Sequence, residues 1–532
     1  MKHNVKLLIC ALLLTPMMLS AVGCNGGSVV EDTSTATVAS TGADTVTEPI
    51  TEAPTFTVDA AREVYEQISA IETVSLDTEE AVTAAWLSYC ALDDAAKAEV
   101  VNAPRLLEMR DLVADLYART DRRGSKIDRS KILIGSYNLA ISDEQHVREV
   151  AECGLDFMTG VHVLDKLDLL AQYNIGAFTH IIYHNFPYWR GSDRNPGSDP
   201  VTPDYTAEQF EAALTKDICH EAIWGTWIVD EPNAQDYWYY EQIREKFDTF
   251  YEDEDYVGYI NLFPNYAGSS QLGTKTYEDY INMYVEQIDT DYICYDHYMY
   301  TNSTGRGDLM NQLLNLRIAA NACRENDRDL WLWQHVNSTN PEVFLSVDQL
   351  RMQANISMAF GAQSIIWGCW FPGWWSNNVY DADGNKTEQY DKLKTVNAEI
   401  NALSPEIIKY NNLDVNVVGS LNRLRKWNVS DDNIIDQSIM TDISAPGEKV
   451  NVLCGWFEKR IGNGNAMMFV NMTDSDCIEK PTANVTFRVA DGYCATVHTS
   501  DGSYVLSPDA DGVYHLDIEN AEYAFVALQS IN

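Results

Sequence analysis

Eight short apolar runs that alternate with amphipathic stretches constrain the fold of this chain more than any other feature. The runs are rich in β-branched and aromatic residues, which is typical of buried strands. They span residues 131–139, 155–162, 176–183, 223–232, 256–264, 292–300, 329–336 and 364–371. Apolar residues recur at helical spacing between most of them, for example in YEDYINMYVEQI and SVDQLRMQANISMAFG. Eight strand–helix repeats predict an α/β fold, a closed (β/α)₈ barrel over 130–411. A doubly wound open sheet competes, but no Gly-rich phosphate loop follows the first run.

The pattern changes on both sides of the barrel. Residues 58–121 carry three helical patterns, AREVYEQISAIETV, EEAVTAAWLSYCAL and PRLLEMRDLVADLY, which predict a small helical bundle. Residues 412–532 carry short strand patterns at hairpin spacing with turns such as NGNG, SDGS and DADG, which predict an antiparallel β-sandwich. The bundle resembles a small helical module of Gram-positive surface proteins, and we expect it to act as a spacer or packing module.

The first residues have the pattern of an export signal. Lys2 and Lys6 precede an apolar run that is too short for a transmembrane helix. The run ends in Ala21-Val22-Gly23-Cys24, which resembles the lipobox of bacterial lipoproteins. The resemblance implies cleavage of a signal peptide, 1–24, before Cys24 and lipidation of that cysteine. Plain secretion is the alternative. Residues 25–57 are rich in Thr, Ser, Ala and Glu, a composition that predicts a disordered tether. We expect the protein to be exported and anchored to the membrane by its lipid, with the tether holding the folded part away from the membrane.

The charge balance narrows the possible partners. The 532 residues include 37 Lys and Arg against 79 Asp and Glu, a net charge of −42. So acidic a surface argues against binding nucleic acid, and it suits a neutral substrate such as a carbohydrate. The chain also carries 13 Trp and 29 Tyr, whose flat faces can pack on sugar rings, although ordinary core packing accounts for most of them.

No pattern in the sequence indicates a cofactor. The 11 cysteines are scattered, without CxxC or Cys/His spacing, and HExxH and EF-hand patterns are missing from the sequence. We therefore expect neither a metal nor another cofactor. Cys294 and Cys369 lie within strand patterns, which predicts that both are small buried apolar residues.

The fourth run, WGTWIVDEPN, ends in two carboxylates. Pro232 cannot continue the strand, so Asp230 and Glu231 are expected at its C-terminal rim. In a (β/α)₈ barrel, that rim is where active sites are built. A pair of solvated turn residues is the alternative, since Asp and Pro also favour turns.

Polar groups at the ends of other runs strengthen the catalytic interpretation. They include Asp296, His297 and Tyr298 after the sixth run and Gln334 and His335 in the seventh. The others are His162, His184 and Asn185 after the second and third runs, Asn265 after the fifth, and Trp370, Trp374 and Trp375 after the eighth. We expect Asn265, Tyr298, His297, Gln334 and His184 to contact substrate, and the three tryptophans to form a stacking platform for a sugar ring.

Cleavage of a glycosidic bond needs two carboxyl groups, one to protonate the departing oxygen and one to attack the sugar or activate water. Glu231 and Asp296 are the best candidates, because one strand separates the fourth run from the sixth. At about 4.8 Å per strand their Cα atoms would lie on the order of 10 Å apart. Asp230 would then orient Glu231, hold a hydroxyl or support the loop.

The blocks WIVDEPN, YINLFPNYA, YICYDHYMY, LWLWQHV and Leu350–Trp375 resemble the (β/α)₈ glycoside hydrolases of the large retaining clan, especially family-forty-two-like β-galactosidase barrels. In that clan the fourth strand ends Asn-Glu, and the match implies that Glu231 is the general acid/base, with Asp230 in the Asn position. The clan's nucleophile, a Glu on the seventh strand, has no counterpart in Trp333-Gln334-His335. Asp296 is the substitute on chemical grounds. In a variant that resembles α-galactosidase barrels, Asp230 is the nucleophile and Asp296 the acid.

The sequence thus favours a cell-surface glycoside hydrolase that cleaves a glycan or oligosaccharide. The missing seventh-strand carboxylate motivates an alternative, a degenerate barrel that binds carbohydrate without cutting it. A purely structural surface protein is a third hypothesis. A glycan array combined with hydrolysis assays separates the three.

Overall fold

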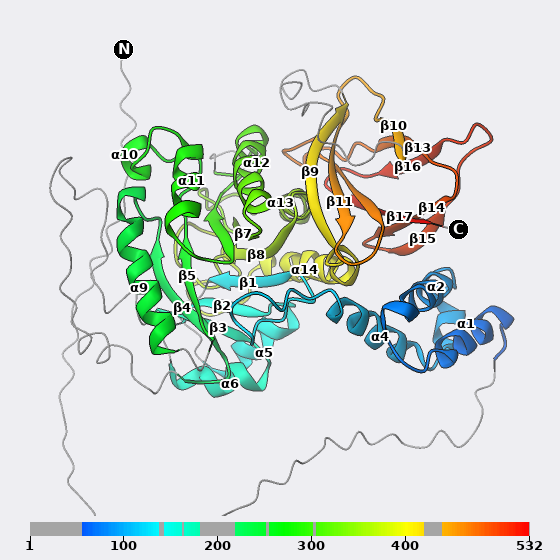
Figure 1. Ribbon diagram of the computed structural model, residues 1–532, viewed down its shortest axis with the longest axis horizontal. Coiled ribbons are helices and arrows are strands. Elements are labelled where there is room, and N and C mark those ends of the chain that lie inside the picture. Colours follow the sequence, from blue (N-terminus) through cyan, green and yellow to red (C-terminus); the bar gives the residue numbers. More distant parts are fainter. Residues whose placement is uncertain are drawn as a thin grey trace, which may run out of the picture. The chain divides into compact units, whose positions relative to one another are not determined.

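The computed structural model describes residues 56–137, 143–161, 164–180, 219–251, 255–301, 305–419 and 439–530 (Figure 1). All of them belong to one compact unit, Thr55–Asn532. The predictions for the signal peptide, Cys24, His162, His184, Asn185 and nearly all of the tether lie outside the described residues. None of the helices in the described part is long and apolar enough to cross a membrane.

The central element is a barrel of parallel strands, which confirms the predicted fold class. The strands are β1 (Leu133–Tyr137), β2 (Phe157–Val161), β3 (Gly176–Thr179), β4 (Ile223–Asp230), β5 (Val257–Asn261), β6 (Tyr292–Asp296), β7 (Asp329–His335) and β8 (Ala362–Gly368). Seven of them fall within the predicted apolar runs, and β8 begins two residues before the eighth run, at Ala362. They are hydrogen-bonded in the order β5-β4-β3-β2-β1-β8-β7-β6. A parallel bridge between Leu262 and Tyr295 joins β5 to β6, so the sheet returns on itself.

Helices follow most of the strands, as the amphipathic stretches predict (Figure 1). They are α5 (Glu144–Glu152), α6 (Leu167–Gln172), α9 (Tyr237–Phe250), α10 (Ser269–Leu272), α11 (Tyr277–Gln287), α12 (Leu309–Glu325), α13 (Val347–Ala359) and α14 (Glu388–Ile407). Local signals fix their starts. Ser346 caps α13 by accepting from the backbone N–H of Gln349, whose side chain bonds back to Ser346.

Alternate residues along β5, β6 and β7 fill the interior of the barrel. Tyr259, Cys294, Trp331 and Trp333 belong to one apolar cluster inside it. Trp331 stacks on Tyr292 with the ring centroids 4.5 Å apart. Because side chains alternate between the two faces of a strand, the next inward residues toward the C-terminal end are Asn261 on β5 and Asp296 on β6. The packed interior therefore ends in a polar layer.

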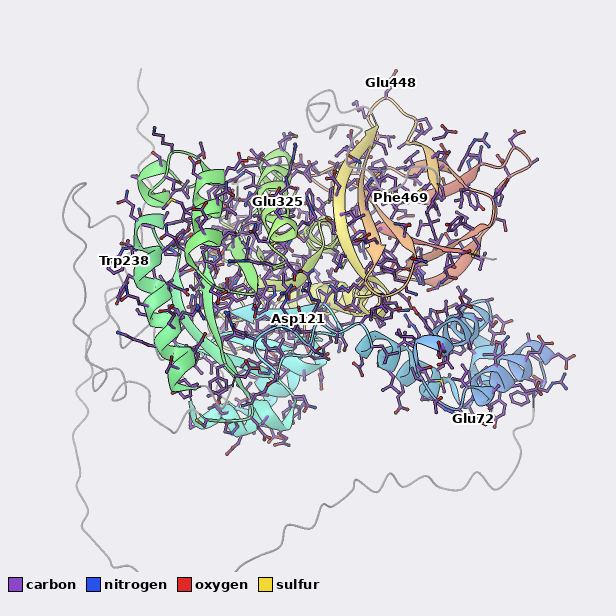
Figure 2. All side chains as sticks on the ribbon, viewed as in Figure 1. Glu72, Asp121, Trp238, Glu325, Glu448 and Phe469 are labelled. Carbon is purple, nitrogen blue, oxygen red and sulfur yellow. The ribbon has the colours of Figure 1, made fainter. Side chains whose placement is uncertain are left out.

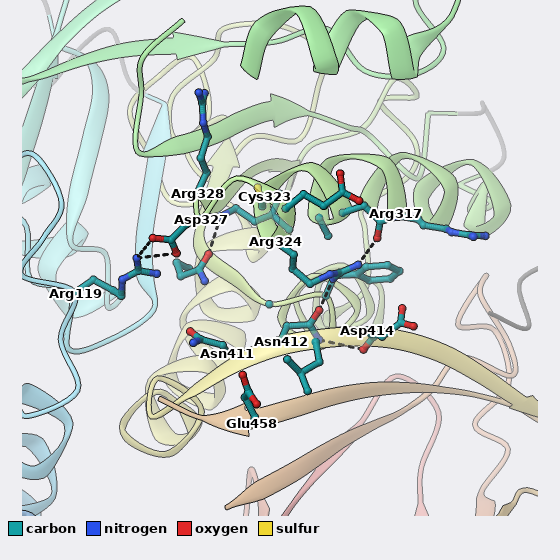
Figure 3. A pocket seen from close by; sticks show the side chains of 18 residues that line it. Arg119, Arg317, Cys323, Arg324, Asp327, Arg328, Asn411, Asn412, Asp414 and Glu458 are labelled. Carbon is teal, nitrogen blue, oxygen red and sulfur yellow. Dashed lines mark hydrogen bonds and ion pairs between the residues drawn. The ribbon is translucent and has the colours of Figure 1, made fainter. Parts of the chain in front are cut away.

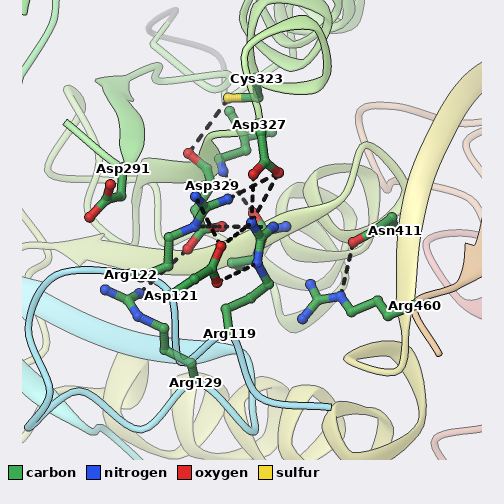
Figure 4. A network of polar contacts seen from close by, with 12 residues as sticks. Arg119, Asp121, Arg122, Arg129, Asp291, Cys323, Asp327, Asp329, Asn411 and Arg460 are labelled. Atoms are coloured by element: carbon green, nitrogen blue, oxygen red, sulfur yellow. Dashed lines mark hydrogen bonds and ion pairs between the residues drawn. The ribbon is translucent and has the colours of Figure 1, made fainter. Parts of the chain in front are cut away.

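An ion-pair network lies at the opposite, N-terminal end of the barrel (Figure 4). Arg122 and Arg129 contact the carboxylate of Asp329, at the start of β7, at 3.5 and 3.4 Å. Arg119 and Arg122 contact Asp327 at 2.9 and 3.2 Å. These arginines belong to the charged segment between the helical bundle and the barrel, so the network fastens that segment to the base of the barrel.

The C-terminal part forms two antiparallel sheets, as predicted. Its strands are β9 (Tyr410–Gly419), β10 (Met440–Ser444), β11 (Asn451–Lys459), β12 (Asn465–Asn471), β13 (Ala483–Val489), β14 (Tyr493–Thr499), β15 (Gly502–Leu506), β16 (Tyr514–Ile518) and β17 (Tyr523–Ser530). The sheet orders are β15-β14-β17-β12-β11-β9 and β10-β13-β16. Phe469 and Phe487 stack between them at 5.8 Å. β9 begins at Tyr410, just before the predicted limit at residue 412, and the domain limits stay predictions.

The N-terminal part contains the three predicted helices, α1 (Asp59–Ala70), α2 (Glu79–Cys90) and α4 (Ala103–Asp115), and a fourth, α3 (Asp94–Glu99). Buried ion pairs join this bundle to the rest of the unit. Glu79 contacts Lys409 at 3.4 Å and Lys459 at 2.8 Å. Glu406, at the end of α14, contacts Arg110 at 3.3 Å and Lys409 at 2.9 Å. The bundle thus packs through paired charges against α14 and against the two C-terminal sheets, β9 to β17, which together form the β-domain.

Many of the surplus acidic side chains lie at the surface. Glu72, Glu325 and Glu448 are exposed on three separate parts of the chain, whereas Phe469 is buried in the β-domain (Figure 2). Exposed carboxylates of this kind are solvated, so most of the net charge requires no binding partner.

Candidate active site

The corner after β4 places two carboxyl groups at the C-terminal end of the barrel. Asp230 pairs with Asn261 in the parallel register of β4 and β5. Glu231 follows with a backbone φ of +49°, in the left-handed region that non-glycine residues rarely adopt. Its backbone N–H donates to the carbonyl of Asn261 at 2.8 Å. Such strain is tolerated where the surrounding structure enforces it, and it clusters at functional sites.

Neighbouring residues hold this corner in place. The hydroxyl of Tyr280, on α11, donates to the carbonyl of Pro232 at 2.8 Å. Asn233 is buried, accepts from the backbone N–H of Gln235, and donates to the carbonyls of Ser270 and Gln271. The DEPN sequence therefore builds a fixed corner rather than a solvated turn.

One amide group connects Asp230 to Asp296. The Asn261 Nδ2 donates to Asp230 Oδ1 at 3.0 Å and to Asp296 Oδ1 at 3.2 Å. The two oxygens therefore lie no more than about 6 Å apart, since a single nitrogen bonds to both. Asp296 is only 5% exposed. The structure thus brings together two of the three predicted catalytic residues across β4, β5 and β6.

The electrostatics place Glu231 in the same cluster. Burial raises the pKa of Glu231 well above its usual value, and the charges of Asp296 and Asp230 raise it further. Burial and the charge of Asp230 raise the pKa of Asp296 to about 8, against hydrogen bonds from Asn261 and Tyr298. Burial raises the pKa of Asp230 to about 6, against the Asn261 hydrogen bond. Of the two aspartates, Asp230 is the more readily ionised, and the surroundings of Glu231 favour its protonated form.

Aromatic side chains line the cluster on the β6 and β8 side. Tyr298 bonds to Asp296 and lies against Trp375, with the ring centroids 5.1 Å apart. Trp375 is 38% exposed, which suits a stacking surface. Trp374 is half-buried and packs on Tyr137 at 5.2 Å. Tyr266 lies beside the same carboxyl groups. Burial raises the pKa of its hydroxyl, and the charges of Asp296 and Glu231 raise that pKa further.

Four of the predicted contact residues are buried or bonded to other parts of the protein, and their contact with substrate stays a prediction. Gln334 is fully buried on the outer face of β7, where it donates to the Gln353 carbonyl on α13 at 2.8 Å. Trp370 is fully buried against Tyr380 and Tyr390. It belongs to the core outside the barrel.

The other two are Asn265 and His297. Asn265 donates to the Asn311 carbonyl on α12 at 3.2 Å, and its Oδ1 is shielded from solvent. His297 is 1% exposed, and burial lowers its pKa to about 3, so its ring is neutral and inaccessible. His335 is likewise fully buried and accepts from the backbone N–H of Tyr300 at 3.0 Å. His297 and His335 instead pack against Tyr266, Tyr298 and Trp375, the aromatic side chains beside the carboxyl groups.

Asn261 is the site residue that sequence reasoning missed. The fifth apolar run continues to Pro264, which moved the expected strand end from Asn261 to Asn265. A polar residue that alternates with Val257 and Tyr259, the inward residues of that run, is the signal that would have identified it. Cys294 and Cys369 are buried as predicted.

A cavity of about 750 Å³ lies elsewhere, between the end of α12 and β9 (Figure 3). Four arginines and four acidic residues line it, and the arginines have structural partners. Arg119 pairs with Asp327, Arg324 bonds to Asn412, and Arg328 donates to backbone carbonyls. The three carboxyl groups at the barrel rim do not line it.

Within the described part of the chain, no group of His, Cys, Asp and Glu side chains has the arrangement of a metal site. In that part of the chain, the buried Cys153, Cys294, Cys323, Cys369 and Cys454 carry free thiols.

Comparison with known proteins gives likenesses of fold. No family profile matches the sequence, and a search of curated proteins finds no match. Among solved structures, the chain is similar to the glycoside hydrolase family 30 subfamily 8 xylanase Xyn30A from Clostridium acetobutylicum, with 10% identity and a TM-score of 0.36 over 75% of this chain and 96% of that one. It is also similar to an endo-β-1,4-mannanase from Thermotoga petrophila, with 8% identity and a TM-score of 0.34 over 75% of this chain and 92% of that one. A third similar structure is a glucosidase from Croceicoccus marinus, with 7% identity and a TM-score of 0.35 over 76% of this chain and 96% of that one. Likenesses at this identity concern the fold alone and assign no residue or substrate.

Proposed function

We propose that this protein is a glycoside hydrolase in which Glu231 donates the proton and the Asp230–Asp296 pair supplies the negative charge. The observation that carries the proposal is the cluster itself. Three carboxyl groups meet at the C-terminal end of a barrel, one amide ties two of them together, and their environments push their pKa values apart. Carboxyl groups with separated pKa values can act as acid and base at the same pH.

The chemistry follows from these states. The protonated Glu231 gives its proton to the glycosidic oxygen as the bond from that oxygen to the sugar C1 breaks. The ionised member of the Asp pair stabilises the positive charge that develops at C1, or attacks it. Water then adds its hydroxyl to C1, displaces the Asp carboxylate where that group has bonded to C1, and gives its other proton to Glu231. Asp230 is the better anion, because its pKa is raised only to about 6, whereas that of Asp296 is raised to about 8.

The sharpest test compares leaving groups across a panel of aryl glycosides. In Glu231→Gln, hydrolysis of glycosides with poor leaving groups should fall about 10²–10⁴-fold. Dinitrophenyl glycosides, which need no protonation, should be cleaved with a much smaller loss. Asp230→Asn and Asp296→Asn should lower both rates. Glu221→Gln is the matched control, because Glu221 is exposed beside the start of β4, at the opposite end of the strand.

Equal turnover by Glu231→Gln and the wild type on poor leaving groups would refute the assignment of the acid. Binding of glycans with no turnover on any of them would favour a carbohydrate-binding protein instead. The seventh strand motivates that second candidate, because its inward end carries His335 and no carboxyl group.

We also propose that the protein is exported and anchored to the membrane by lipid at Cys24. The support is the apolar leader and the Ala-Val-Gly-Cys sequence. Cells that express the full chain should incorporate radiolabelled palmitate into it. The Cys24→Ala variant should lose the label and be released in soluble form, and label retained by that variant would refute the proposal.

A further inference from the structure

A line of hydrogen bonds runs from the interior of the barrel to the carboxyl pair. It begins at Trp333, on β7, whose indole N–H bonds to the hydroxyl oxygen of Tyr259, on β5. An indole N–H can only donate. The Tyr259 oxygen is therefore the acceptor in this contact, and its own proton is available for another bond.

The next two links have their direction fixed in the same way. The Tyr259 hydroxyl lies 3.0 Å from Cys294 Sγ, and Cys294 Sγ lies 3.6 Å from Asn261 Oδ1. An amide oxygen can only accept, so the thiol donates to Asn261 and accepts from Tyr259. Burial raises the pKa of Cys294 well above its usual value, so the thiol proton is present. All three side chains are buried.

The line ends on the two carboxyl groups. Because the Asn261 oxygen accepts from Cys294, its Nδ2 must face Asp230 and Asp296, and both bonds are made. If the amide turned over, its oxygen would face two carboxylates instead of a thiol. Hydrogen bonds from an amide N–H favour the ionised form of a carboxyl group, and a facing oxygen disfavours it.

We propose that Cys294, supported by Tyr259, is a positioning residue of the site: its thiol fixes the orientation of the Asn261 amide and so maintains the negative charge on the Asp230–Asp296 pair. The thiol touches neither carboxyl group and acts through Asn261. The consequence for catalysis rests on the proposed function, but the effect on the carboxyl groups does not.

The test measures carboxyl titration directly. Protein labelled with [4-¹³C]aspartate is titrated by NMR, with Asp230 and Asp296 assigned from Asp230→Asn and Asp296→Asn. Cys294→Ala should raise the midpoint of the pair by at least about 0.5 pH unit, because the amide is no longer held. Cys294→Ser keeps a donor at the same place and should stay within about 0.2 pH unit of the wild type. Tyr259→Phe should shift the titration midpoint of the Asp230–Asp296 pair in the same direction as Cys294→Ala.

Cys454→Ala is the matched control, since Cys454 is a buried cysteine of the β-domain that donates to the Val452 carbonyl. It should leave the midpoint unchanged. An unchanged midpoint in Cys294→Ala would overturn the proposal. Equal shifts in the Ala and Ser variants would overturn it too, because they would trace the effect to packing.

The NMR titration tests the positioning role of Cys294 even if the protein hydrolyses no substrate. If the wild-type protein hydrolyses nothing but the midpoints move as expected, the proposed function fails and the positioning role stands. If glycosides are cleaved, the acid limb of the pH–rate profile of Cys294→Ala should move upward with the NMR midpoint. An acid limb that stays in place would refute the role in catalysis.

Discussion

Replacing Asp230 by Asn should stabilise the protein above neutral pH, although it removes a group of the proposed site. The folded pKa of Asp230 rises from 3.8 to about 6, chiefly because of burial. A raised carboxyl pKa means that folding favours the protonated form. The stability associated with that form is complete below about pH 4 and is lost as the pH rises through about 6.

The magnitude follows from the same values. A pKa raised from 3.8 to about 6 corresponds to about 3 kcal/mol, the free energy that the wild type gives up once Asp230 is ionised. Asn at position 230 carries no charge, yet its amide oxygen can still accept from Asn261. The loss of the charge at 230 also removes repulsion on Asp296, whose pKa that charge helps to raise. The gain in stability should therefore be at least as large.

The assay is urea unfolding followed by tryptophan fluorescence at several pH values. The free energy of unfolding of Asp230→Asn should exceed that of the wild type by about 3 kcal/mol near pH 8 and by less than about 1 kcal/mol near pH 4. Asp383→Asn, on an exposed turn, is the control and should change little at either pH. A difference that is the same at pH 4 and pH 8, or a variant less stable than the wild type at pH 8, would refute the reasoning.

Three further predictions concern other parts of the molecule. Trp375→Ala should raise KM about tenfold with little change in kcat, because the exposed ring can stack on substrate, whereas Trp370→Phe should leave KM unchanged; equal KM values for Trp375→Ala and wild type would contradict this. Glu406→Gln should destabilise the protein by about 3 kcal/mol, because it removes the carboxylate that contacts Arg110 and leaves Lys409 with Glu79 alone; limited proteolysis should then release the helical bundle sooner than in the wild type. Asp329→Asn should lower the unfolding temperature by several degrees through loss of its contacts with Arg122 and Arg129, while kcat per folded molecule stays the same; a large fall in kcat would mean that the two ends of the barrel are coupled.

The strands of the barrel could be predicted because buried parallel strands are continuous apolar runs. Because such runs are apolar throughout, the sequence does not show where each strand ends or which of its side chains point into the barrel. In the fifth run the apolar pattern continues into Leu262 and Phe263, although β5 ends at Asn261. Leu262 makes the bridge that closes the barrel, and the pattern cannot distinguish that bridge from the strand.

The faces of β7 show the limit most clearly. Its residues Trp331, Leu332 and Trp333 are all apolar, so no alternation indicates which of Gln334 and His335 points inward. The structure places Trp331 and Trp333 inside the barrel and Leu332 in the surrounding core. Gln334 shares the outward face with Leu332, so it packs on α13. The carboxyl groups were easier to predict because a charged residue at the end of an apolar run is conspicuous.

The two ends of the barrel show why its acidic residues behave differently. Asp329, at the N-terminal end of β7, contacts two arginines within 3.5 Å. At the other end, the Asn261 amide, the Tyr298 hydroxyl and the backbone N–H of Asp296 itself donate to the Asp296 carboxyl group, and all three donors are neutral. The two guanidinium groups compensate the charge of Asp329, whereas burial raises the pKa of Asp296 to about 8 against its neutral donors. Both ends hold a buried aspartate, and it is at the C-terminal end, beside Asp296, that Glu231 adopts its strained backbone.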